Sequence, residues 1–259
     1  LNEAVMRLPL QASIGAAVAY DATSGGDVMF TASPLLIYSQ SVELVSALTW
    51  NRDAVVITQF VARTDGGTID GAAMYRIMDR SASVRAHTDA MDLGWLSGLA
   101  RHAASGTLSA SADLAYSNST VGVMWTASSD ELSRSNITAR GVRSTGHYAW
   151  TNRRHHLDES VWSIADLTLG QQSITSMTAR IRTENDHLLI QLGAAISKPI
   201  GARVATDVEL SRTGSTYTVV VPRFDGTAAG MPFRQTGPTI VRYGSNRWSA
   251  VINQVEWND

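Results

Sequence analysis

The stretch SMTARIRTENDHLLIQLGAAISKPIGARVATDVELSRTGSTYTVVVP, residues 176–222, decides the fold class. Between residues 202 and 212, apolar or β-branched side chains take every second position, namely Val204, Thr206, Val208 and Leu210. A period of two is typical of a β-strand with one buried face. The polar residues at 184–186 and 212–215 indicate turns. We therefore expect successive antiparallel strands here. The intervening charges of both signs favour a soluble sheet, with a packed core on one face and water or a charged neighbour on the other.

Most of the remaining chain fits the same class. Residues 54–62, AVVITQFVA, are β-branched and aromatic, as in a buried strand. Residues 69–104 differ, because Met91, Trp95, Leu99 and Ala103 recur every four residues, which indicates one face of an amphipathic helix. Two loops are expected, at 152–160 and 223–238. The sequence thus predicts a mainly β fold, an antiparallel β-sandwich or barrel of jelly-roll type. It forms a single domain over 1–259 with a short helical insertion around residues 69–104.

Composition excludes several classes of protein. The absence of Cys rules out disulfides, thiol nucleophiles and thiolate zinc sites. Lys198 is the sole Lys and stands outside any phosphate-loop motif, so nucleotide-hydrolysing loops are excluded. The formal net charge of −2 gives no global attraction to nucleic acid or acidic membranes, and no apolar run is long enough for a transmembrane helix. The chain begins with Leu1, which is compatible with a processed product.

A segment at residues 134–156 interleaves Arg with aromatic residues and contains no acidic residue. Such a mixture is found in protein–protein hot spots and in single-strand nucleic-acid sites. Asp130, Glu131, Asp158 and Glu159 bracket the segment, which favours a solvated face or a charge-complementary contact between subunits over nucleic acid. The candidate interface or anion-binding residues are Arg140, Arg143, Tyr148, Trp150, Arg153 and Arg154.

Histidine and carboxylate side chains gather at the end of this segment and just beyond it. His155, His156 and Asp158 are weak candidates for a metal site, with His147 eight residues upstream. Adjacent side chains on a strand point to opposite faces, so His155 and His156 are not expected to ligate one ion. A polar surface loop is the favoured interpretation, and no metal or other cofactor is predicted.

Three functions fit these observations. The favoured one is a non-enzymatic structural assembly protein, a viral or phage capsid or outer-shell subunit acting in a homo- or hetero-oligomeric assembly in the virion or outside the cell. An outer-membrane β-barrel is the first alternative; the aromatic content of 7% and the expected helix weigh against it. A carbohydrate-active hydrolase on a β-scaffold is the second, although no catalytic residue or carboxylate pair stands out.

Overall fold

The computed structural model describes residues 14–21, 25–37, 40–95, 104–151, 154–198, 200–244 and 247–257. Their contacts divide the chain into two compact units. The first unit comprises residues 1–127 and 150–154, and the second comprises residues 128–149 and 155–259. The expectation of a single domain stays a prediction. Each unit is described by itself.

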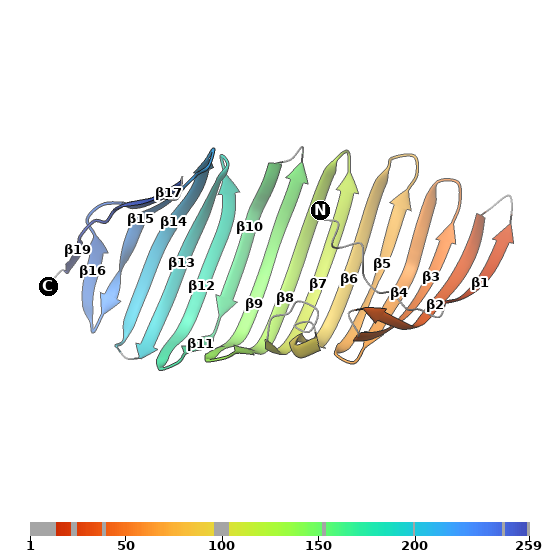
Figure 1. Ribbon diagram of the computed structural model, residues 1–259, viewed down its shortest axis with the longest axis horizontal. Helices are drawn as coiled ribbons and strands as arrows, with labels where there is room; N and C mark the ends of the chain where they lie inside the picture. The colour runs from red at the N-terminus through yellow and green to blue at the C-terminus, as the bar shows by residue number, and fades with distance from the viewer. Residues whose placement is uncertain are drawn as a thin grey trace. The chain divides into compact units, whose positions relative to one another are not determined.

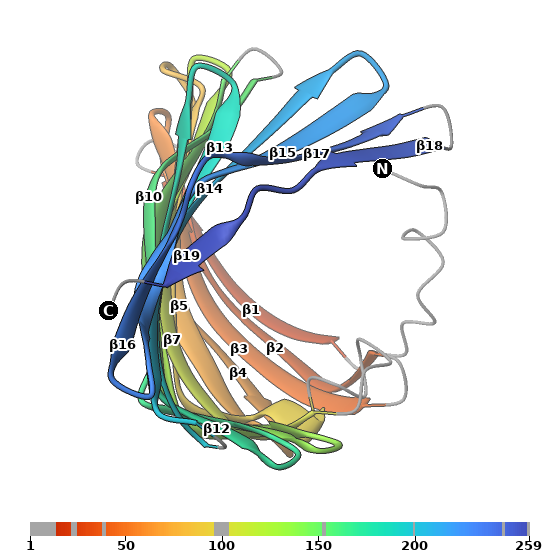
Figure 2. The ribbon, with the colours of Figure 1, turned by 90° about the vertical axis from the view of Figure 1, so that its left-hand side faces the viewer.

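The first unit is an antiparallel meander in which consecutive strands pair in chain order (Figure 1). Its strands are β1 (Ile14–Asp21), β2 (Gly25–Ile37), β3 (Gln40–Trp50), β4 (Ala54–Thr64), β5 (Gly67–Arg76), β6 (Ser81–Asp92) and β7 (Ser105–Ser117). In Figure 2 strands β2 to β5 lie in one layer. Three further strands have residues in both units: β8 (Thr120–Arg134), β9 (Ile137–Thr151) and β10 (Arg154–Ile164).

The second unit continues with the same antiparallel pairing. Its strands are β11 (Asp166–Leu169), β12 (Gln172–Glu184), β13 (His187–Lys198), β14 (Ala202–Thr213), β15 (Thr216–Ala228), β16 (Met231–Gln235), β17 (Thr239–Gly244), β18 (Arg247–Val251) and β19 (Val255–Trp257). Strands β12 to β15 pair in chain order, and β15 then pairs with both β16 and β17.

Tight turns explain why neighbours in sequence become neighbours in the sheet. Asn118 and Ser119 join β7 to β8, and Asn185 and Asp186 join β12 to β13, all with positive φ. Two-residue turns of this kind match the twist of the strands that they connect, and Asn and Asp tolerate the left-handed conformation. The turns predicted at 184–186 and 212–215 are therefore confirmed.

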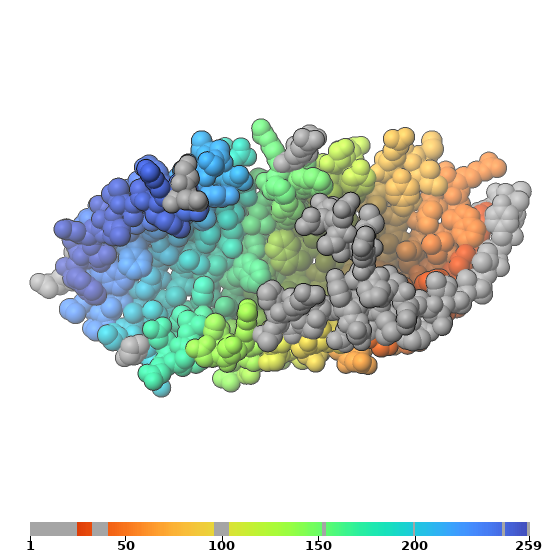
Figure 3. Space-filling model, viewed as in Figure 1, coloured from red at the N-terminus to blue at the C-terminus, as the bar shows by residue number. Residues whose placement is uncertain are grey.

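Most apolar side chains of the described strands are half-buried rather than fully buried. Each pair of described strands with substantial contact is a hydrogen-bonded pair of the sheet. Among the residues whose burial is described, the buried apolar ones are Ala32, Val42, Met91, Ala139, Val142, Ala179 and Phe233. In Figure 3 a few small openings are visible between the space-filled side chains.

The predicted mainly β, antiparallel fold is confirmed, and strand is right for residues 54–62. A short helical segment occurs at 93–95, but the helical insertion is wrong for residues 69–92, which lie in β5 and β6. Leu99 and Ala103 lie outside the described residues. Met91 is only 1% exposed and lies against Gly67, at the end of a strand rather than on a helix face.

Two predicted loops are strands. Residues 154–160 begin β10, and residues 223–235 form a hairpin of β15 and β16 that turns at Ala229 and Gly230. Pairing with a neighbouring strand satisfies the backbone of these polar stretches, which composition alone suggests to be loops. In the described part of the chain, no helix has the length and apolar character needed to cross a membrane.

Candidate functional site

The structure divides the predicted Arg/aromatic segment between the two units. Arg140, Arg143 and Tyr148 belong to the second unit, whereas Trp150 and Arg154 belong to the first. Arg153 lies outside the described residues. The Arg140 Nε donates to Glu131 Oε2 at 2.8 Å, so one of the bracketing acids pairs within the chain. The proposed role of this segment as an interface or anion site stays a prediction.

The histidines at the end of that segment, His155 and His156, have separate partners. His156 Nε2 lies 2.7 Å from Asp158 Oδ1, and the other carboxylate oxygen contacts His147. His155 instead contacts the hydroxyl of Tyr148. The expectation that His155 and His156 diverge is therefore confirmed. No group of three His, Cys, Asp or Glu side chains in the described ranges could hold a metal ion.

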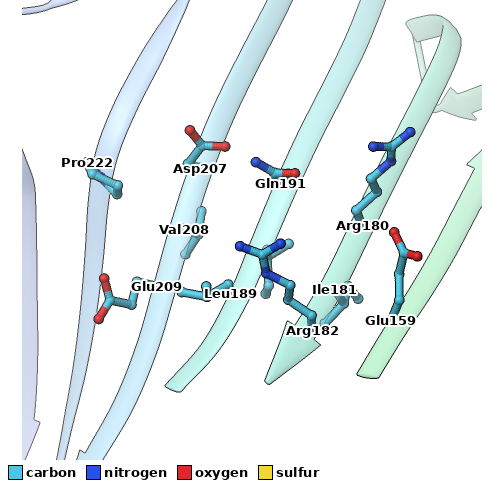
Figure 4. Close-up of a pocket in the computed structure, with 11 residues that line it drawn as sticks. Glu159, Arg180, Ile181, Arg182, Leu189, Gln191, Asp207, Val208, Glu209 and Pro222 are labelled. Atoms are coloured by element: carbon cyan, nitrogen blue, oxygen red, sulfur yellow. The ribbon is translucent and has the colours of Figure 1, made fainter. Parts of the chain in front are cut away.

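A different polar surface gathers on the second unit, on the face that we call the charged face. The strand register places directly paired residues on one face of a sheet. Arg180 of β12 pairs with Gln191 of β13, which pairs with Asp207 of β14. One row further, Arg182 pairs with Leu189, which pairs with Glu209. Two guanidinium groups thus stand along β12 and two carboxylates along β14, with β13 between them (Figure 4).

Strand β13, which lies between the two columns of charges, has no charged side chain among residues 189–195 on this face, and two of its residues there are small. On the charged face β13 presents Leu189, Gln191, Gly193 and Ala195 in turn. A cavity of about 250 Å³ lies here, lined by Arg180, Arg182 and Glu159 on one side and by Asp207 and Glu209 on the other. A second hollow continues over Gly193 and Ala205. We call this combined feature the β13 trough.

Some charges of the trough have partners. Arg182 pairs with Glu184 at 3.2 Å, His187 contacts Glu209, and Arg223 pairs with Asp225 of its own strand. By contrast, no hydrogen bond or ion pair joins the side chains of Arg180, Gln191 or Asp207 to the rest of the described chain. The trough therefore presents one guanidinium, one amide and one carboxylate in a single row. Arg223 of β15 stands directly opposite Asp207. The hydrogen bond that Arg223 donates to Asp225 and, to a smaller extent, the Asp207 carboxylate raise the pKa of the Arg223 guanidinium.

The opposite face of the same strands is apolar, and we call it the apolar face. One row runs through Ile181, Ile190 and Val208, and the next contains Ala179, Leu192, Thr206 and Phe224. Strand β10 contributes Trp162, which pairs with Ala179 and is 42% exposed. Most of these side chains are half-buried.

Aromatic side chains occur at both ends of the apolar face. At the turn end, the Arg212 guanidinium lies 5.2 Å above the ring of Tyr217, which pairs with Tyr243. The rings of Tyr243 and Trp248 are 4.5 Å apart, and Trp248 is 72% exposed. At the other end, Phe233 lies between Phe224 and Trp257, with ring centroids 5.4 and 5.3 Å apart.

The first unit shows the same division into faces. A single cross-strand row of its apolar face contains Trp50, Val55, Tyr75, Ala82 and Tyr116. The alternate positions carry Glu43, Arg63, Arg85, His87 and Asp113, which form its charged face.

Sequence reasoning missed the trough as a site. The period of two was the signal available in the sequence. It places Arg180 and Arg182 on the same face of their strand, and Asp207 and Glu209 on the same face of theirs. Only the register of β12, β13 and β14 shows that these two pairs flank the same strand.

No family model matches the chain, and the searches of curated proteins and of solved structures return no match either.

Proposed function

We propose that these strands form the wall of a transmembrane β-barrel of the outer-membrane type. In this proposal the apolar face contacts lipid and the charged face lines an aqueous interior. The observation that carries it is the division, in both units, between an apolar face and a charged face. A sheet in lipid needs this arrangement, because lipid solvates apolar side chains and leaves polar ones to the lumen.

Strand length supports the proposal. Strands β12 to β15 have 12 or 13 residues each. A tilted strand needs about 9–11 residues to cross the hydrocarbon region. The lipid-facing rows between Arg212 and Val204 span eight residue steps of β14, which is about 27 Å along the strand. At the tilt of about 40° typical of such barrels this becomes about 20 Å, close to an apolar band of roughly 25 Å.

The distribution of aromatic residues also supports it. Their content is low. In the second unit Tyr217, Tyr243 and Trp248 lie at one end of the apolar face and Phe233 and Trp257 lie toward the other, while Trp162 and Phe224 occupy a middle row. Tyr and Trp concentrate at the two interfaces of membrane barrels, where an apolar ring and a polar group are both solvated. The two sequence-based objections, few aromatic residues and a helix at 69–104, therefore lose most of their weight.

The proposal includes closure of the sheet, since an open edge in lipid leaves backbone groups without hydrogen bonds. The capsid or outer-shell subunit favoured by sequence analysis stays an untested prediction, and its assembly would have to cover the apolar face with neighbouring copies. The hydrolase alternative likewise stays an untested prediction.

The experiment uses two substitutions at adjacent positions of β13. Ile190 lies mid-way along the apolar face and Gln191 lies on the charged face, so Ile190→Arg and Gln191→Arg add the same group to opposite faces. The chain is folded from urea into lipid vesicles, and insertion is followed by heat-modifiable gel migration and by quenching of Trp fluorescence with brominated lipid. We expect Ile190→Arg to lower the free energy of unfolding by about 2–4 kcal/mol, and Gln191→Arg to have little effect.

Two outcomes would contradict the proposal. One is equal behaviour of the two variants. The other is a chain that folds without detergent or lipid and forms large particles by light scattering, which would instead favour the capsid subunit.

A further inference from the structure

We propose that the β13 trough binds a small zwitterionic solute, with its carboxylate on Arg180 and its ammonium group on Asp207. This inference rests on the proposed function in one respect, namely that the charged face lines water through which solutes pass. It adds a chemical class of ligand and the residues that select it.

The first step is geometric. Arg180, Gln191 and Asp207 occupy one cross-strand row on three adjacent strands. Neighbouring strands lie about 4.8 Å apart, so the backbones that carry the guanidinium and the carboxylate are about 9.5 Å apart. The Gln191 amide stands between them and keeps the two charges from pairing. Figure 4 shows the three side chains on β12, β13 and β14 around the cavity.

The second step concerns which charges are available. Arg182, Glu209 and Arg223 make ion pairs, whereas no hydrogen bond or ion pair of Arg180 or Asp207 is found in the described part of the chain. Arg223 stands opposite Asp207 but makes its ion pair with Asp225. A guanidinium binds a carboxylate through two parallel hydrogen bonds, and a carboxylate accepts from an ammonium group. Arg180 and Asp207 thus supply complementary partners for the two ends of a zwitterion.

The third step concerns selectivity against simple ions. The cavity is lined by two cations, Arg180 and Arg182, and three anions, Glu159, Asp207 and Glu209. An anion on Arg180 would be repelled by Asp207, and a cation on Asp207 would be repelled by Arg180 and by Arg223, which stands opposite Asp207 on β15. A solute that carries both charges in the matching order meets attraction at each end, which favours it over either ion alone.

The fourth step concerns size. The cavity of about 250 Å³ lies below the range of roughly 300–1,000 Å³ typical of drug-sized ligands. Gly193 and Ala205 leave a hollow beside the charged row, with room for a short carbon chain. A Cβ at Gly193 would come 3.3 Å from Thr178 Oγ1, so this space depends on the glycine. A solute of amino-acid size fits these limits better than an oligosaccharide.

The test measures binding to the full chain after folding into lipid vesicles. The probes are ω-amino acids from glycine to 6-aminohexanoate, which vary the separation of the two charges, with butyrate and butylamine as singly charged controls. Titration calorimetry is expected to show a preferred length and at least a tenfold tighter binding of that zwitterion than of butyrate or butylamine. Equal binding of the zwitterion and a singly charged control would overturn the proposal.

Variants test the two ends separately. Arg180→Gln and Asp207→Asn are each expected to weaken zwitterion binding at least tenfold, whereas Arg203→Gln, on the same face but outside the cavity, leaves it unchanged. The double variant Arg180→Asp with Asp207→Arg keeps both charges and reverses their order. Because the probes can bind in either direction, the double variant should restore affinity to within a few-fold. Loss in all variants including Arg203→Gln, or no recovery in the double variant, would contradict the assignment.

Insertion is checked in each sample by heat-modifiable migration, so the two proposals fail separately. An inserted chain that binds no zwitterion overturns only the trough proposal. A chain that binds the zwitterion in detergent-free buffer without inserting overturns only the membrane proposal.

Discussion

The charged faces of the two units differ in where the opposite charges stand. In the first unit, Glu43 pairs directly with Arg63 across β3 and β4, and Arg85 pairs directly with Asp113 across β6 and β7. Both pairs make ion contacts, at 3.5 and 2.7 Å. In the second unit, Arg180 and Asp207 are two strands apart with Gln191 between them, and neither makes a described ion pair.

This difference shows that strand register, rather than composition, decides what a charged face does. Charges one strand apart neutralise each other and leave an even polar surface. Charges two strands apart, over a strand of small or neutral side chains, flank the cavity of the second unit, although Asp207 also has Arg223 directly opposite it on β15. Register thus decides whether opposite charges meet directly, as Glu43 and Arg63 do, or stand apart across a strand, as Arg180 and Asp207 do.

The largest expected change in the free energy of unfolding concerns the apolar face, which both units have. Val84 of β6 lies on this face in the first unit, while its neighbour Ser83 lies on the charged face. Val84→Arg should lower the free energy of unfolding in lipid vesicles by about 2–4 kcal/mol, as Ile190→Arg does in the second unit. Ser83→Arg is the matched control. Urea titration with Trp fluorescence measures both, and tolerance of Val84→Arg would restrict the lipid-facing surface to the second unit.

A smaller effect is expected at two glycines of the apolar faces. A Cβ at Gly71 would overlap the carbonyl oxygen of Arg85 and the ring of Phe60, and one at Gly226 would overlap the carbonyl oxygen of Arg203. Gly71→Ala and Gly226→Ala should each destabilise the fold by about 1–3 kcal/mol, the usual range for overpacking.

Gly201→Ala provides the control for this pair, because nothing lies within 4 Å of the added Cβ. The same urea titration compares the three variants. If Gly201→Ala destabilises the chain as much as the other two, general loss of glycine flexibility, rather than steric overlap, would be the cause.

The smallest effect on stability is expected when the second unit is given the charge order of the first. Gln191→Glu places a carboxylate directly opposite Arg180, as Asp113 is opposite Arg85. The new exposed ion pair should change the free energy of unfolding by less than about 1 kcal/mol. Gln191→Glu should nevertheless weaken zwitterion binding, because the new carboxylate then occupies Arg180. The control is Gln191→Met, which removes the amide without adding a charge and so separates the effect of the charge from the loss of the amide. Unchanged affinity in Gln191→Glu would mean that Arg180 does not hold the carboxylate.

Local pattern was enough to predict much of the fold. Alternation at 202–212 marks β14, and the Asn, Asp and Gly residues between strands mark the hairpin turns, since few other residues adopt a positive φ at low energy. The alternation and the turn residues each depend on only a few neighbouring residues, so they can be recognised without knowing how the strands pair.

Prediction was weaker where pairing overrides local preference. Strand β6 carries Ala82, Ala86 and other small side chains that suit a helix equally well, and its hydrogen bonds to β5 and β7 settle it as a strand. The start of β10 was expected to be a loop because it is rich in His and Arg, yet it pairs within the sheet. Trp95 does lie in the short helical segment at 93–95, and it packs against Gly66 in the turn that follows β4.

By itself, the sequence determined that the chain is mainly β, that its strands alternate apolar and charged side chains, and where most of its turns lie. Each of these follows from the period of two and from backbone preferences of single residues. The tertiary structure alone decided that Arg180 and Asp207 flank Gln191, and that Tyr217, Tyr243 and Trp248 come together at one end of the apolar face. Those relations depend on the register between strands, which hydrogen bonding across the sheet sets and no single strand encodes.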